Sequence, residues 1–217
     1  MRGGRTTSKD PTTMPKLKSV IQSPRTTIAD IAAHLDGLTH SSRMHELSTT
    51  SRADQRTLWE KAQGEAGHIT LEHFLPSNVP ALRPVVHHGR NTLPLPDKQK
   101  FFRKPMVRPA DGTPRAFGYN DAPSEELVGP GYFVLEATKG NTNWEPRGTF
   151  VVDYFQHPDG PVASGWPRVR SNREGLQRLV YYGTRDFMRR VSQHVSIGAA
   201  YKGEKPLDHY FTLCRED

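Results

Sequence analysis

An arginine, two serines and a histidine occupy every second position near the end of the chain. On a β-strand, Arg190, Ser192, His194 and Ser196 would share one face, with neighbouring side chains about 7 Å apart. A histidine in such a row can act as general base toward a hydroxyl or a bound water, and an arginine can hold an anion. The row is therefore a weak candidate catalytic site of a hydrolase-like enzyme. We favour the simpler interpretation, the polar outer face of an antiparallel sheet.

The positions between these polar residues are apolar. They predict one long, half-buried strand that begins at about Phe187 and places this second face in the core. The residues from 176 to 188 fit a helix or a strand, and the sequence leaves this open. A turn at 203–206 and a return strand at 207–215 would complete a hairpin. The apolar residues of the long strand are Phe187, Val191, Val195, Ile197, Ala199 and Tyr201.

Other patterns that could carry chemistry are weaker. The chain has ten histidines but a single cysteine, and a structural zinc site needs four ligands, often with cysteine among them. We therefore expect no metal and no cofactor. No sequence motif of a known catalytic class is present, which favours a protein that is not an enzyme.

The single cysteine excludes an intrachain disulfide, and there is no long apolar run and no secretory signal. We expect a cytoplasmic location.

The elements expected along the chain fall into three parts. Residues 1–26 are basic and lack periodicity, as in a disordered basic arm. Residues 27–66 predict short helices, of which two start at Thr27 and Ser51, each with an aspartate three residues later. Residues 67–217 read as an antiparallel β-rich domain, in which 76–97 is an irregular proline-rich segment. The expected strands are 100–108, 115–119, 132–138, 149–156, the long strand from Phe187, and 207–215.

Aromatic residues are common in the expected strands and often adjacent, which puts rings on both faces of a strand. One ring can fill the core, while the other must line a second buried face, a ligand cavity or a contact surface. A curved sheet with an apolar inner side is suited to small apolar or acyl-type molecules. The ligand-binding candidates are Phe102, Tyr119, Phe133, Tyr154 and Tyr182.

The chain carries a net charge of +7, which favours an anionic partner or surface. Basic residues are interleaved with aromatic ones at the start of the 100–108 strand, a combination that also suits single-stranded nucleic acid. Arg103, Lys104 and Arg108 are the candidate contacts there, together with the N-terminal arm. No sequence signature of a known RNA-binding module accompanies them.

These observations predict an α+β protein. A disordered basic arm and short N-terminal helices precede a predominantly antiparallel, curved or barrel-like β-sheet of six or seven strands. The function that we favour is a non-enzymatic binding protein whose curved sheet holds a small apolar ligand or a protein partner. The alternatives are a nucleic-acid-associated protein and an enzyme that uses His194.

Overall fold

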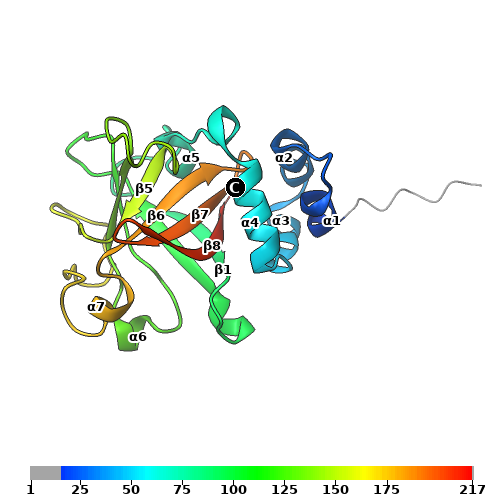
Figure 1. Ribbon diagram of the computed structural model, residues 1–217. Coiled ribbons are helices and arrows are strands. Elements are labelled where there is room, and N and C mark those ends of the chain that lie inside the picture. Colours follow the sequence, from blue (N-terminus) through cyan, green and yellow to red (C-terminus); the bar gives the residue numbers. More distant parts are fainter. Residues whose placement is uncertain (1–15, 217) are drawn as a thin grey trace, which may run out of the picture.

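The computed structural model describes residues 16–216 and shows a closed barrel of eight antiparallel strands with helices packed on one side (Figure 1). Each strand pairs with the next one in the sequence, and β1 also pairs with β8. The α+β class and the antiparallel, barrel-like sheet are therefore confirmed, with eight strands in place of six or seven. The strands are β1 (Val85–Asn91), β2 (Phe101–Val107), β3 (Ala116–Gly118), β4 (Phe133–Ala137), β5 (Phe150–Asp153), β6 (Thr184–Arg190), β7 (Val195–Lys202) and β8 (Lys205–Arg215).

Within residues 16–216, four helices of six or more residues precede the barrel: α1 (Leu17–Gln22), α2 (Ile28–Asp36), α3 (His40–Ser48) and α4 (Arg52–Lys61). Both expected helix starts are confirmed. The hydroxyls of Thr27 and Ser51 accept from the backbone N–H of Asp30 and Asp54, and each aspartate side chain accepts from the backbone of its cap. These capping boxes satisfy N–H groups that a helix start leaves without partners.

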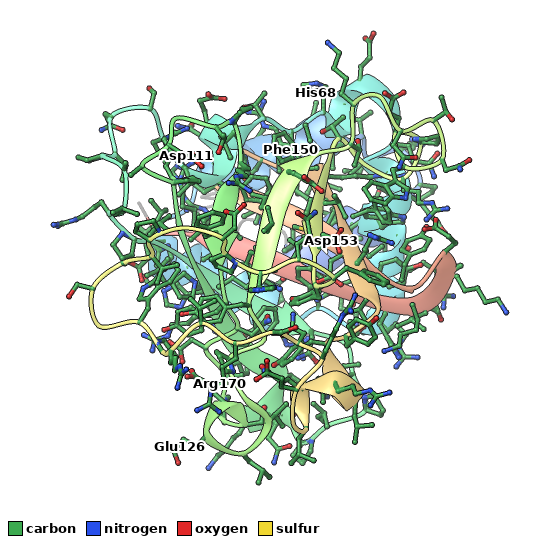
Figure 2. The ribbon with its side chains drawn as sticks, turned by 90° about the vertical axis from the view of Figure 1, so that its left-hand side faces the viewer. His68, Asp111, Glu126, Phe150, Asp153 and Arg170 are labelled. Atoms are coloured by element: carbon green, nitrogen blue, oxygen red, sulfur yellow. The ribbon has the colours of Figure 1, made fainter. Side chains whose placement is uncertain are left out.

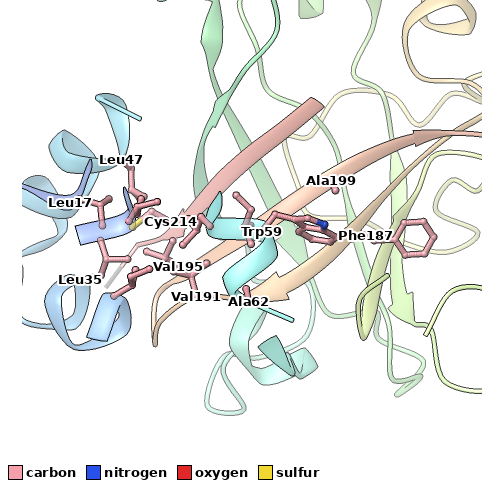
Figure 3. Packing of buried hydrophobic residues seen from close by; sticks show 14 of the residues in the cluster. Leu17, Leu35, Leu47, Trp59, Ala62, Phe187, Val191, Val195, Ala199 and Cys214 are labelled. Carbon is pink, nitrogen blue, oxygen red and sulfur yellow. The ribbon is translucent and has the colours of Figure 1, made fainter. Parts of the chain in front are cut away.

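The helices pack on the outer face of the barrel over β7 and β8, as Figure 3 shows. Leu17, Leu35 and Leu47 come from the helices, and they share one buried cluster with Val195 of β7 and Cys214 of β8. The odd-numbered apolar residues from Phe187 to Ala199 therefore lie in the core, as their alternation predicts. They pack against helices on the outside of the barrel.

A second buried cluster fills the inside of the barrel. Apart from Tyr154 just after β5, Tyr181 and the segment around α5 (Leu71–Phe74), its members come from β1 to β6 and β8. Residues on opposite strands of a closed barrel can meet only in the interior. Phe74 of α5 enters this cluster against Phe150 and His87, so α5 covers one end of the barrel. At the other end lie α6 (Glu125–Val128) and α7 (Gln177–Val180) (Figure 1). Two short 3₁₀ turns, Gly64–Gly67 and Asp97–Lys100, complete the structure.

Three expectations about individual segments are wrong. Residues 16–26 do not belong to a disordered arm, because they contain α1 with Leu17 and Ile21 fully buried; residues 1–15 lie outside the described part of the chain. The proline-rich segment 76–97 contains β1, since the seven residues Val85–Asn91 between Pro84 and Thr92 contain no proline and pair with two strands.

The third correction concerns the long strand expected from Phe187 to Tyr201. The structure divides it into β6 and β7, joined by a turn at residues 191–194. The backbone N–H groups of Val191 and Ser192 both donate to the carbonyl of Val195, and Gln193 N donates to the carboxylate of Asp36 at the end of α2. The segment 176–188, which the sequence left open, holds α7 and then the start of β6.

Candidate functional site

Lys104 lies inside the barrel. It stands on β2 between Phe102 and Met106, whose side chains also face the interior, and only 1% of it is exposed. Its Nζ is 3.6 Å from Oδ2 of Asp186 on β6. In the ring of eight strands, β2 and β6 stand opposite each other, so this ion pair crosses the interior of the barrel.

Four aromatic rings surround the Lys104 ammonium. Its Nζ lies 4.8 Å from the ring centroid of Phe133, 5.0 Å from that of Tyr154, 5.2 Å from that of Phe211 and 5.7 Å from that of Phe102. All four distances fall within the roughly 6 Å over which an aromatic face attracts a cation. We call these four residues the aromatic cage.

Each phenylalanine of the cage lies over a glycine of the neighbouring strand. Phe102 pairs with Gly89, Phe133 with Gly118, and Phe211 with Gly198. A methyl group on Gly89, Gly118 or Gly198 would come within 2.5 Å of the ring opposite. The three glycines therefore leave the space into which the rings tilt, a way of seating aromatic residues on a sheet.

Polar groups extend from the lysine toward the α7 end of the barrel. Lys104 Nζ donates to the hydroxyl of Tyr154, and this hydroxyl donates to Oδ1 of Asn120 over 3.2 Å. Asn120 in turn donates to the carbonyl of Gly131 over 2.9 Å. Tyr181, which follows α7, stacks on Tyr154 with ring centroids 5.4 Å apart. The buried polar atoms are thus linked to one another, as burial requires.

Burial shifts the pKa of each ionisable group in this network toward its uncharged form. It lowers the pKa of Lys104 to about 8, against the opposing attraction of Asp186. Burial also raises the pKa of Asp186, which Lys104 opposes, and raises that of Tyr154 well above its ordinary value. Such shifted groups are more frequent at functional sites than elsewhere, although structural ion pairs show them too.

A pocket of about 390 Å³ lies against the edge of this site. It is bounded by α3, β1, the start of β2 and the segment after Asn120, and Phe102 forms part of its wall. Phe102 is half-buried, and it is the cage residue that is also part of the pocket lining. The pocket is lined by Met44, His88, Gly89, Phe101, Phe102, Arg103, Asp121, Ala122 and Pro123.

The five predicted ligand-binding aromatics do not form one site. Phe102, Phe133 and Tyr154 meet in the cage around Lys104. Tyr119 instead packs against Tyr132 and Trp166, and Tyr182 packs against Phe155. Tyr119 follows the end of β3 and Tyr182 follows α7, so neither side chain stands on a strand that faces the cage.

The predicted nucleic-acid contacts are also separated. The prediction is wrong for Lys104, which lies inside the barrel and cannot reach a strand of nucleic acid. Arg103 is exposed, but its guanidinium lies 2.5 Å from the carboxylate of Asp121. Arg108 donates to the carbonyl of Leu75 over 2.7 Å. The charged groups therefore share no basic surface of the kind that the sequence predicted.

The row from Arg190 to Ser196 does not form a single strand face, since the turn at 191–194 interrupts it. Arg190 is exposed at the end of β6, whereas Ser192 in the turn and Ser196 on β7 are buried. Ser192 Oγ accepts from the backbone N–H of His194 over 3.4 Å. The interpretation of this row as a solvated outer face is thus wrong for the two serines, and catalysis by His194 stays a hypothesis.

Sequence reasoning missed the roles of Lys104, Asp186, Asn120 and Phe211. One signal was present: Phe102, Lys104 and Met106 alternate along an expected strand, so an apolar inner face would have to include the lysine. The partner across the barrel could not be read from the sequence, because 82 positions separate 104 from 186 and no local pattern links them.

A comparison of the chain with family models, curated proteins and solved structures finds no match. Within residues 16–216, no helix has the length and apolar character needed to cross a membrane. The same residues contain no group of three or more histidine, cysteine, aspartate or glutamate side chains placed to hold a metal ion.

Proposed function

We propose that the protein binds a small acyl ligand inside the barrel, with the carboxylate of the ligand at Lys104 and its apolar chain among the interior side chains. The observation that carries this proposal is the buried ion pair of Lys104 and Asp186, with its ammonium enclosed by the four rings of the aromatic cage. A buried lysine and aspartate stabilise a fold less than apolar side chains of similar size. A ligand with a carboxylate head group would give the buried Lys104 cation a binding role that folding alone does not require.

The donor geometry of Lys104 is compatible with such a ligand. Its Nζ lies 3.6 Å from Asp186, beyond the usual length of a charge-assisted hydrogen bond. The ammonium has three donors, and one is used by the hydroxyl of Tyr154. A ligand carboxylate could therefore accept from Lys104 while the aromatic cage excludes water.

Entry would require movement of Phe102. Side chains fill the interior of an eight-stranded barrel of this kind, and Phe102 is the cage residue that borders the pocket. Rotation of its ring into the pocket would open a path to Lys104. The other three cage residues are each less than 7% exposed, so Phe102 is the one best placed to move.

The test compares decanoic acid with its methyl ester by isothermal titration calorimetry. The ester keeps the chain but lacks the negative charge, so the native protein should bind the acid at least about tenfold more tightly. In the double variant Lys104→Met and Asp186→Leu, which removes both buried charges, this preference should disappear. Lys139→Met, which changes an exposed lysine, should retain it.

Circular dichroism and thermal unfolding would first establish that the double variant is folded. Equal affinity of the native protein for acid and ester would overturn the proposal, as would failure to bind either. Retention of the preference by the folded double variant would show that another cation holds the carboxylate.

A further inference from the structure

Four large apolar side chains are exposed at the α6–α7 end of the barrel. Leu127 of α6 is 76% exposed and Leu179 of α7 is 77% exposed, and Leu176 and Val180 are about half exposed. Apolar side chains this exposed and this close together are uncommon on the surface of a monomeric protein unless they mark an interaction site.

These side chains belong to one surface, because α6 and α7 are held together. The side-chain oxygen of Gln177 in α7 accepts from the backbone N–H of Gly131 over 3.3 Å. It also lies against Gly129, the residue that ends α6, where an added methyl group would be 2.7 Å away. Figures 1 and 2 show both turns at the same end of the barrel. We call Leu127, Leu176, Leu179 and Val180 the apolar tip.

Arginines flank the apolar tip. Arg168, Arg170, Arg173 and Arg178 are all exposed, and none forms an ion pair with a carboxylate in residues 16–216. The guanidinium of Arg173 lies 5.3 Å from the ring centroid of Tyr182. Figure 2 shows Arg170 at the same end of the barrel as Glu126 of α6.

The acidic groups near the tip do not cancel these charges. Glu126 and Glu174 are exposed, whereas Glu125 is partly buried, and its pKa is raised by burial and by the nearby Asp121 and Glu126. The exposed charges therefore comprise four arginines and two glutamates. A surface with protruding leucines inside a set of unpaired arginines matches the boundary of an anionic membrane, where apolar groups enter the lipid and guanidinium groups meet phosphates.

We propose that the α6–α7 end of the barrel docks on the surface of an anionic membrane, with the apolar tip inserted at the headgroup boundary. The docking surface is separate from the interior site and does not depend on the proposed ligand. It lies over the end of the barrel that Tyr181 closes, and Tyr181 stacks on Tyr154 of the aromatic cage.

The test measures partitioning of the full chain onto vesicles of phosphatidylcholine that contain about 30% phosphatidylserine. Binding should exceed that to pure phosphatidylcholine and should weaken as salt is added. The double variant Leu127→Ser and Leu179→Ser should lower the partition coefficient at least about tenfold. Leu95→Ser, at an exposed leucine in the loop between β1 and β2 and outside the apolar tip, should cost far less.

The arginines are tested by the double variant Arg170→Gln and Arg178→Gln, with a predicted loss of about tenfold or more on the anionic vesicles. Arg25→Gln with Arg83→Gln removes the same charge from exposed positions elsewhere and should cost far less. Both leucine and arginine variants keep residues 1–15 intact, so binding by that basic segment would survive in them.

Three results would overturn the proposal. They are equal binding to vesicles with and without phosphatidylserine, full binding by the leucine variant, and equal losses in the two arginine variants. Binding to soluble polyglutamate without binding to vesicles would instead identify the surface as one for acidic polypeptides.

Discussion

The ammonium of Lys104 and the carboxylate of Asp186 lie 3.6 Å apart across the interior of the barrel. The two residues stand on β2 and β6, which have no strand in common as neighbours. No hairpin or pair of adjacent strands can therefore bring them together, and the pair forms only when the sheet has curved fully. Burial removes both charges from water, which costs folding free energy. The mutual attraction of the two groups offsets this cost only while both are present.

This dependence predicts the outcome of a double-mutant cycle. Lys104→Met and Asp186→Leu should each lower the free energy of unfolding by about 3–5 kcal/mol, because each leaves one buried charged group without its partner. The double variant should be more stable than either single variant, since it leaves neither charge. Urea denaturation followed by tryptophan fluorescence measures all four proteins. Additive losses in the double variant would show that the two side chains do not act as a pair.

The glycines beneath the cage predict how much stability each glycine-to-alanine substitution should cost. An alanine at Gly198 would place its methyl group 2.2 Å from the ring of Phe211, which is buried on all sides, and should cost about 1–3 kcal/mol of stability. An alanine at Gly89 would meet Phe102 at 2.3 Å. This loss should be smaller, because Phe102 is only half-buried and its ring is less confined than that of Phe211.

Gly160→Ala serves as the matched control in the same denaturation experiment. Its methyl group would have no neighbour closer than 3.8 Å, so the change should be neutral or slightly stabilising. A greater loss for Gly89→Ala than for Gly198→Ala would contradict the view that Phe102 is the mobile ring of the cage.

The α5 end of the barrel predicts sensitivity to acid. His87 is 1% exposed, and burial lowers its pKa to about 3; its Nε2 has no hydrogen-bond partner among the described residues. An unfolded histidine titrates near 6.5. Between about pH 6.5 and about 3 the unfolded state holds more protons than the folded state, so stability falls as the pH falls through this window. Burial also lowers the pKa of His73, which adds to the loss of stability in acid.

The measurement is the slope of unfolding free energy against pH between about 6 and about 4. His87→Leu should reduce the slope by up to about 1.4 kcal/mol per pH unit, the value for one proton. His157→Leu, at an exposed histidine, should leave it unchanged. If both variants have the native slope, His87 is already protonated in the folded barrel.

The fold could be predicted where the determining signal is local. The starts of α2 and α4 depend on Thr27 and Ser51 with an aspartate three residues on, and these contacts lie within one helical turn. The strands β2 to β5 and β8 were recognisable from short apolar runs bounded by turns. The strand β1 was not, because prolines on both sides suggested irregular chain, and its two partners lie elsewhere in the sequence.

The candidate site was predictable only in part, for a different reason. Alternation shows that two residues of one strand share a face, but it cannot say which face becomes the inside of a barrel. The aromatic pattern indicates Phe102, Phe133 and Tyr154 as ligand-binding residues, whereas it places Lys104 among nucleic-acid contacts, because basic residues are interleaved with aromatic ones there. The turn at 191–194 was missed since Val191, Ser192, His194 and Val195 continue the alternation through it.

The pairing of β1 with β8 has a consequence for biosynthesis. Every strand of the barrel has two neighbours, so the finished protein presents no strand edge to which another chain could add. Until β8 is made, however, β1 and β7 each expose one edge. The barrel can therefore close only once β8 is available for pairing, and until then the unpaired edges of β1 and β7 must be kept from pairing with other chains.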